Sequence, residues 1–301
     1  MKKKTCIIIA GPTAVGKTTA AIELANYYST EIISADSRQC YKELNIGVAK
    51  PSQDELISVR HYFIDSHSIH DSINAADFEK YALDAVEKIF SKSDIAVMVG
   101  GTGLYIKAFC EGLDQIPAVN PDIRNFVVAQ YNLLGMEWLT KELKDKDPIY
   151  CKVGEMQNPR RMMRALEVML SSGHSIVNYQ SHHSVNRDFN IVKIGIELPR
   201  DILYERINKR VDEMIDKGLV SEAEKLLSFK YLNALQTVGY KELFDCFDGK
   251  ITEKRAIELI KQNTRHYAKR QMTWFKKDTA FNWVRPDVSS IKTYIDQSVH
   301  F

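Results

Sequence analysis

The chain has 301 residues, of which 45% are hydrophobic and 27% are charged, and its formal net charge is +2. That length allows one large domain or two, and that hydrophobic content excludes a disordered chain. With a charge so close to neutral, any surface that binds an anionic partner must be local.

The first hundred residues alternate short apolar strands with helical segments. Strands are expected at 6–10, 31–35 and 95–99, and helices at 18–27 and 75–90. Short apolar strands between helices predict an α/β fold, in which helices cover both faces of a parallel sheet. The run of lysines at positions 2–4 is not read as part of a secretory leader, because the apolar stretch after it is short and no cleavage site follows.

A helical insertion is expected to interrupt this core. Pro121, Pro148 and Pro159 stand where helices would start, and Gly173 stands where one would end. The apolar segment 191–198 resembles a late strand of the same sheet. The sequence therefore predicts a core made of 1–112 and 191–301, with an insertion domain at 113–190. After Pro199 the chain is expected to be almost wholly helical, with helices at 201–217, 221–229 and 252–275.

Cysteine usage and hydropathy exclude several other classes. The five cysteines are scattered and form no C-x-x-C pair, which argues against a disulfide framework and a structural zinc site. His182 and His183 lack a nearby cysteine pair and are expected in a polar loop. No apolar run approaches the roughly 18 residues that span a membrane. The protein is expected to be soluble, cytoplasmic and monomeric.

Residues 11–18, G-P-T-A-V-G-K-T, match the phosphate-loop pattern G-x-x-x-x-G-K-[ST] between a strand and a helix. Backbone N–H groups and the helix N-terminus would hold phosphate oxygens there. Lys17 would contact the terminal phosphate, and the Thr18 hydroxyl would ligate Mg²⁺. The residues of the loop expected to bind a diphosphate or a nucleotide are Gly11, Pro12, Thr13, Ala14, Val15, Gly16, Lys17 and Thr18.

The acidic residue nearest to the phosphate loop in the predicted sheet follows a different strand than in NTP-hydrolysing enzymes. NTP-hydrolysing relatives carry an Asp after a later apolar strand, but here the strand at 95–99 ends in Gly100-Gly101-Thr102-Gly103. Asp36 instead follows the second strand. Because parallel strand ends open onto one crevice, Asp36 and Thr102 are expected to face the ligand. Asp36 could bind metal, act as a base, or only cap the next turn.

The motifs together resemble the bacterial tRNA dimethylallyltransferases. They are the phosphate loop, S-A-D-S-R-Q-C-Y (34–41), G-V-A-K-P (47–51), G-G-T-G-L-Y (100–105), N-P-R-R-M-M-R-A-L-E-V (158–168), V-G-Y-K-E (238–242) and R-H-Y-A-K-R-Q-M-T-W-F (265–275). They run in order from residue 8 to about 275. The phosphate loop is shared by many enzymes, whereas the second, fourth and last motifs together are specific. Val48 replaces the usual Thr, and Arg60-His61-Tyr62 replaces a double histidine, departures that put local packing in doubt.

The resemblance implies transfer of a dimethylallyl group from dimethylallyl diphosphate to the N6 amine of the adenosine 3′-adjacent to the tRNA anticodon, position 37. It implies a P-loop NTPase-like core, release of diphosphate, and a helical insertion that clasps the anticodon stem-loop. Asp36 is the expected general base, Thr102 an orienting partner and Mg²⁺ the cofactor. Arg210 is assigned to the diphosphate, although an ordinary exposed helix face would explain it equally well.

The adenine of a stem-loop must be flipped out of the RNA to reach a diphosphate that is bound in a cleft of the protein. The residues expected to contact tRNA are Asp36, Ser37, Arg38, Gln39, Thr102, Arg124, Arg160, Arg161, Arg164, Gly239, Lys241, Lys269 and Arg270. The last two lie in the basic segment 252–277, which could otherwise be a solvated face. Its aromatics Tyr267, Trp274 and Phe275 are expected in the core rather than as stacking platforms.

Three other functions remain open on the sequence. An adenylate isopentenyltransferase would prenylate a free nucleotide, but the arginines of the insertion favour a polynucleotide. A small-molecule kinase would need an arginine-rich lid, and the Gly-Gly-Thr-Gly strand end suits it poorly. A non-enzymatic RNA-binding module would give Asp36 no role.

Overall fold

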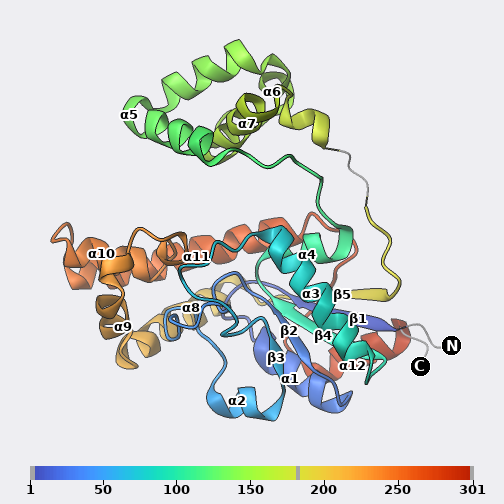
Figure 1. Ribbon diagram of the computed structural model, residues 1–301. Helices are drawn as coiled ribbons and strands as arrows, with labels where there is room; N and C mark the ends of the chain where they lie inside the picture. The colour runs from blue at the N-terminus through green and yellow to red at the C-terminus, as the bar shows by residue number, and fades with distance from the viewer. Residues whose placement is uncertain (1–3, 181–183, 299–301) are drawn as a thin grey trace. The chain divides into compact units, whose positions relative to one another are not determined.

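The computed structural model describes residues 4–180 and 184–298, and its chain forms two compact units (Figure 1). Unit 1 comprises Met1–Glu111 and Asn186–Phe301, and unit 2 comprises Gly112–Val185. The polar loop expected at His182 and His183 lies outside the described residues.

Arg187 accounts for the place where the chain returns to unit 1. Its Nε donates to the Phe109 carbonyl at 2.8 Å, and its Nη2 donates to the Ala108 carbonyl at 3.0 Å. The same nitrogen pairs with Glu79 at 2.6 Å. These contacts lie at the start of the second part of unit 1, which begins at Asn186. The sequence predicted that this part begins at residue 191, with the late strand.

Strands of unit 1 form one parallel sheet in the order β3-β2-β4-β1-β5-β6. They are β1 (Thr5–Ala10), β2 (Ile32–Ala35), β3 (His61–Tyr62), β4 (Ile95–Gly100), β5 (Asn190–Ile196) and β6 (Asn282–Val284). The predicted α/β fold with a parallel sheet is confirmed. The three strands expected in the first hundred residues each end within one residue of their expected bounds.

β3 and β6 are strands that the sequence did not predict. They have two and three residues, too few for a readable hydrophobic pattern. The expectation of an almost wholly helical chain after Pro199 is therefore wrong at β6, which pairs with the end of β5. Both strands lie at the edges of the sheet, where tertiary packing decides whether a short segment pairs.

Helices cover both faces of the sheet, so β1 and β4 are buried along their whole length. α1 (Lys17–Tyr27) and α12 (Val288–Ser298) lie on one face, and α3 (Ala75–Phe90) and α4 (Gly103–Glu111) lie on the other (Figure 1). Ile7 and Ile9 of β1 join Leu24 of α1 in the core. The strand ends are thereby held rigidly, as a site built on them requires.

The remaining helices of unit 1 are α2 (Gln53–Ser58), α8 (Arg200–Asp216), α9 (Leu219–Lys225), α10 (Tyr240–Phe247) and α11 (Glu253–Phe275). α8 and α11 agree with prediction to within one residue. The helix expected at 221–229 is different, because Gly218 in the left-handed conformation starts α9 at Leu219. The chain then continues as a 3-10 turn over Leu227–Phe229.

Unit 2 contains α5 (Pro121–Lys146), α6 (Pro148–Val153) and α7 (Pro159–Ser172). Each helix begins at a proline, as predicted, and each is capped by the Asn or Asp side chain before it. Gly173 ends α7 in the left-handed conformation, also as predicted. The unit has its own core, centred on Leu139, Met162 and Leu166.

Among the described residues, no helix combines the length and the hydropathy that crossing a membrane would require.

Candidate functional site

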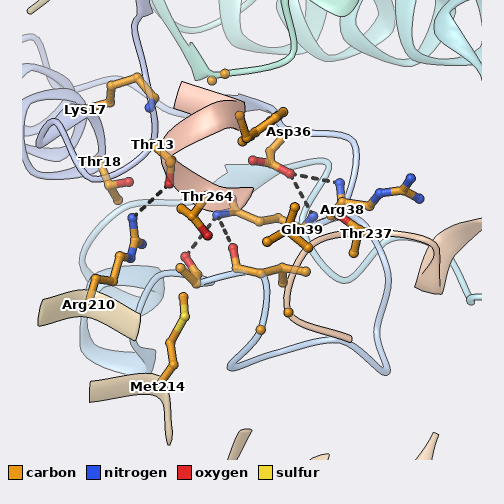
Figure 2. A pocket seen from close by; sticks show the side chains of 18 of the residues that line it. Thr13, Lys17, Thr18, Asp36, Arg38, Gln39, Arg210, Met214, Thr237 and Thr264 are labelled. Carbon is orange, nitrogen blue, oxygen red and sulfur yellow. Dashed lines mark hydrogen bonds between the residues drawn. The ribbon is translucent and has the colours of Figure 1, made fainter. Parts of the chain in front are cut away.

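A cavity of about 170 Å³ opens at the carboxyl ends of β1, β2 and β4. One side carries Thr13, Lys17, Thr18 and Arg210, and the other carries Asp36, Arg38 and Gln39 (Figure 2). All of its lining residues belong to unit 1. The cavity therefore joins the phosphate loop, the acidic strand end and α8 in one enclosure.

The phosphate loop connects β1 to α1 and leaves the N-terminus of α1 without a side-chain cap. Its first-turn N–H groups are thus available to an anion, which a helix N-terminus favours. Thr13, Lys17 and Thr18 line the cavity. The other expected ligands complete the loop without lining the cavity: Gly11, Pro12, Ala14, Val15 and Gly16.

Lys17 and Arg210 concentrate positive charge at this end of the cavity. Lys17 Nζ donates to the Pro12 carbonyl at 2.6 Å, and Arg210 Nη1 lies 3.5 Å from the Thr13 hydroxyl (Figure 2). Burial lowers the pKa of Lys17 to about 7; the charge of Arg210 acts in the same direction, and that of Asp36 opposes it. Burial also lowers the pKa of Arg210. The charge of Arg210 disfavours the Lys17 ammonium and Asp36 offsets this only in part, so a bound diphosphate would stabilise the charged forms of both side chains.

Asp36 directly follows β2 and lines the cavity. Its Oδ1 accepts the backbone N–H groups of Arg38 at 2.9 Å and Gln39 at 3.3 Å (Figure 2). Within the described residues, its Oδ2 makes no hydrogen bond. Asp36 thus caps the turn that follows and still offers a second oxygen, so capping and proton transfer are compatible.

Thr102 and Ser37 connect the ends of β4 and β2. The Ser37 N–H donates to the Thr102 hydroxyl at 3.0 Å, and the Thr102 N–H donates to the Ala35 carbonyl at 3.2 Å. Neither Thr102 nor Ser37 lines the cavity. Arg38 Nη1 donates to the Asn233 carbonyl at 2.9 Å. The structure therefore places these predicted residues around Asp36, with several of their polar groups already bonded to protein.

Gln271 of α11 is a site residue to which the sequence assigned no role, although it stands in a quoted motif. Its Oε1 accepts the Thr13 N–H, and its Nε2 donates to the Gly101 carbonyl, each at 2.9 Å. A Cβ on Gly101 would lie 2.2 Å from that Nε2. A side chain at position 101 would therefore displace the Gln271 amide, which joins α11 to the phosphate loop through Thr13.

The wall of the cavity that α8 contributes is largely apolar. Ile207, Val211 and Met214 line it from one face of α8, and Leu219 and Ile260 add to it. The i, i+4, i+7 spacing on α8, next to Arg210, is the signal that could have revealed this wall.

Val48 and His61 also line the cavity. Both departures from the family pattern therefore lie at the candidate site, whereas the sequence predicted that they would affect only local packing. Phe275 is in the core as predicted, whereas Tyr267 lines the cavity and Trp274 is 38% exposed.

Apart from Arg38, the basic residues expected to contact RNA do not line the cavity. In unit 2, Arg160 and Arg161 are exposed, and Arg124 and Arg164 flank the buried Glu167 at 3.6 Å and 3.5 Å. In unit 1, Lys241, Lys269 and Arg270 are exposed. Lys269 and Arg270 form no ion pair within the described residues. Gly239 is buried and lines the cavity instead.

Oxygen donors near the loop are few. No group of three or more His, Cys, Asp and Glu side chains gathers among the described residues. Among the side chains that line the cavity, the hydroxyls of Thr13 and Thr18 in the phosphate loop and the carboxylate of Asp36 could supply oxygen ligands to a metal ion. Mg²⁺ typically keeps several waters and binds through one or two carboxylates plus substrate phosphates. The donor set therefore fits an ion carried by a diphosphate and does not fit a dedicated protein cage.

A family model described as IPP transferase matches residues 39–278. The chain is 47% identical to the tRNA dimethylallyltransferase of Christiangramia forsetii over 296 residues. The aligned residues make up 98% of each of the two proteins.

Two solved structures are similar over nearly the whole chain. The full-length tRNA isopentenylpyrophosphate transferase from Bacillus halodurans aligns with a TM-score of 0.72 and 36% identity, covering 98% of this chain and 96% of that one. A eukaryotic dimethylallyltransferase acting on tRNA aligns with a TM-score of 0.79, covering 98% of this chain and 77% of that one. At 23% identity the second likeness shows the fold alone.

Proposed function

The chain belongs to the IPP transferase family, and we propose that it is a tRNA dimethylallyltransferase. It transfers a dimethylallyl group from dimethylallyl diphosphate to the N6 amine of the adenosine at position 37, on the 3′ side of the tRNA anticodon. The named relative and the Bacillus halodurans structure support this activity and this substrate class.

The observation that carries the proposal is the composition of the cavity. Lys17, Thr18 and Arg210 form a cationic end, α8 forms an apolar wall, and Asp36 lies across from the cations. An apolar wall next to a phosphate site suits an allylic diphosphate better than a nucleoside triphosphate. A P-loop enzyme that hydrolyses NTP would need a metal-binding carboxylate after β4, where this chain has Gly101 and Thr102.

In the reaction, the N6 lone pair of adenine attacks the allylic carbon as its bond to the diphosphate oxygen breaks. The diphosphate leaves with the bonding electrons, and Lys17 and Arg210 stabilise the charge that develops on it. The nitrogen must lose a proton as the new bond forms. Asp36 Oδ2 accepts that proton, while Oδ1 stays bonded to the turn.

Mg²⁺ is part of the proposal as a cofactor that arrives with the diphosphate. Thr18 would hold it through its hydroxyl, and the ion would neutralise charge on the leaving group. Thr13 on the same side of the cavity and Asp36 across from it are further side chains that could supply oxygen ligands.

We assign RNA binding to two groups of residues, each within one unit. The group in unit 1 comprises Asp36, Ser37, Arg38, Gln39, Thr102, Gly239, Lys241, Lys269 and Arg270, and the group in unit 2 comprises Arg124, Arg160, Arg161 and Arg164. The exposed cations among them would contact phosphates. Ser37, Arg38 and Gln39 stand beside Asp36, where an extruded adenine would enter.

Labelled dimethylallyl diphosphate tests the proposed activity. Incubation with an anticodon stem-loop RNA that carries the target adenosine should label the RNA, and incubation with AMP should not. Replacing that adenosine by guanosine is the matched RNA control, because the N6 amine is then absent. Label in AMP but not in RNA would contradict the proposal in favour of a nucleotide prenyltransferase.

Lys269→Ala and Arg270→Ala should weaken stem-loop binding for every RNA sequence tested. Each should also make the slope of log affinity against log salt less negative by about 1, because the loss of one phosphate contact means that about one counterion fewer is released on binding. Fluorescence anisotropy over a salt series measures both quantities. Lys80→Ala, an exposed lysine on α3, is the control, and an unchanged slope in the α11 variants would remove these residues from the interface.

A further inference from the structure

Glu222 of α9 holds a loop of the cavity wall from outside. Its Oε2 accepts the Ile46 N–H at 2.9 Å, and its Oε1 accepts the Gly47 N–H at 3.0 Å. The same Oε1 accepts the Tyr240 hydroxyl at 2.6 Å. Glu222 does not line the cavity, so this carboxylate is engaged by the chain itself. We call residues 45–50 the wall loop.

The wall loop reaches Asp36 through Gln39. Gln39 Nε2 donates to the carbonyls of Val48 at 3.3 Å and Ala49 at 3.0 Å (Figure 2). Its Oε1 lies 3.3 Å from the Ser34 hydroxyl, and its backbone N–H donates to Asp36 Oδ1 at 3.3 Å. Both amide hydrogens of Gln39 are therefore engaged by the wall loop, and Gln39 links that loop to the turn that carries Asp36.

The wall loop depends on support from α9 and α10. Ala49 has a φ of +50°, a left-handed conformation that a non-glycine residue keeps only when its surroundings impose it. A Cβ on Gly47 would lie 2.6–2.7 Å from the Tyr240 ring, which is fully buried. Burial and the carboxylate of Glu222 raise the pKa of Tyr240 far above its usual value. Tyr240 thus stays protonated and donates to Glu222.

We propose that Glu222 is a positioning residue for the transfer reaction, and that it acts through the wall loop and Gln39 to fix the carboxylate of Asp36 against the cavity. This inference rests on the proposed function. It also gives the V-G-Y-K segment a role in the cavity wall, because Tyr240 closes on Gly47 and Gly239 lines the cavity.

Glu222→Gln is the direct test. The carboxamide keeps the size of the side chain but turns an N–H group toward a backbone N–H donor, so one bond to the wall loop is lost. We expect kcat for RNA prenylation to fall about 10-fold. The KM for dimethylallyl diphosphate and the Kd for pyrophosphate should stay within about twofold, because the phosphate loop is untouched. Glu224→Gln, an exposed residue on the same helix, makes the same charge change and should leave kcat unaltered.

Tyr240→Phe keeps the ring against Gly47 and removes only the hydroxyl group. It provides a second test of the inference if Glu222→Gln does not fold. Its kcat should fall about threefold, less than in Glu222→Gln, because Glu222 still accepts both backbone N–H groups. Equal kcat in Glu222→Gln and Glu224→Gln would overturn the inference, as would a parallel loss of pyrophosphate affinity. If the wild-type protein labels no RNA, the proposed function itself fails, and the two failures are thus distinguished.

Discussion

Asp36→Asn is expected to lower the rate of RNA prenylation about 10²–10⁴-fold, the range that general-base assistance contributes. The substitution exchanges Oδ2 for an amide that cannot accept a proton. It leaves an oxygen that can still accept the N–H groups of Arg38 and Gln39, so the turn is preserved. The variant therefore separates the base from the cap.

Single-turnover transfer to the stem-loop RNA, with both substrates saturating, measures this loss. Pyrophosphate and RNA should bind Asp36→Asn about as tightly as they bind the wild-type protein. Asp54→Asn removes an exposed carboxylate from α2 and serves as the control. If Asp36→Asn turns over at the wild-type rate, the proton leaves by another route, and the role of Asp36 is confined to capping.

Lys17→Met is expected to weaken pyrophosphate binding about 100-fold, since a charge-assisted hydrogen bond to a buried phosphate oxygen contributes about 1.5–3 kcal/mol. The same substitution should raise the melting temperature of the ligand-free protein at pH 6. Burial disfavours the Lys17 ammonium in the folded state, and Met occupies a similar volume without a charge. Titration calorimetry and thermal denaturation measure the two effects, with Lys80→Met on α3 as the control. A fall in both affinity and melting temperature would contradict this account.

The pH dependence of Lys17 has a defined sign. The pKa of Lys17 is about 7 in the folded protein, against the ordinary lysine value of 10.5 that applies to the unfolded chain. Between these two pH values the unfolded chain binds a proton that the folded chain does not. This group therefore makes stability rise with pH through that window. A bound diphosphate favours the ammonium, so binding dimethylallyl diphosphate at pH 8 should take up a proton. Calorimetry in two buffers of different ionisation enthalpy detects that uptake, which Lys17→Met should abolish.

Local chemistry was enough to predict much of this protein. The glycines and Lys17 of the phosphate loop, the buried strands at its flanks and the prolines at the helix starts act over a few residues. The parallel sheet and the helix starts in unit 2 were therefore predictable from the sequence, and the resemblance of its motifs predicted the family. β3 and β6 were not, because two or three residues pair only when the rest of the sheet presents an edge to them.

Some features of the candidate site were likewise predictable from the sequence, and others were not. The sequence placed Asp36 and the phosphate loop at strand ends, and parallel topology alone brings such ends together. It did not show that Gln271 bonds Thr13 and Gly101, that α8 supplies an apolar wall, or that Glu222 holds the wall loop. These contacts join residues that lie more than a hundred positions apart in the chain, where no local pattern records the partner. The reactive groups of this protein were thus determined by its sequence, whereas only the tertiary structure decided what holds them in place.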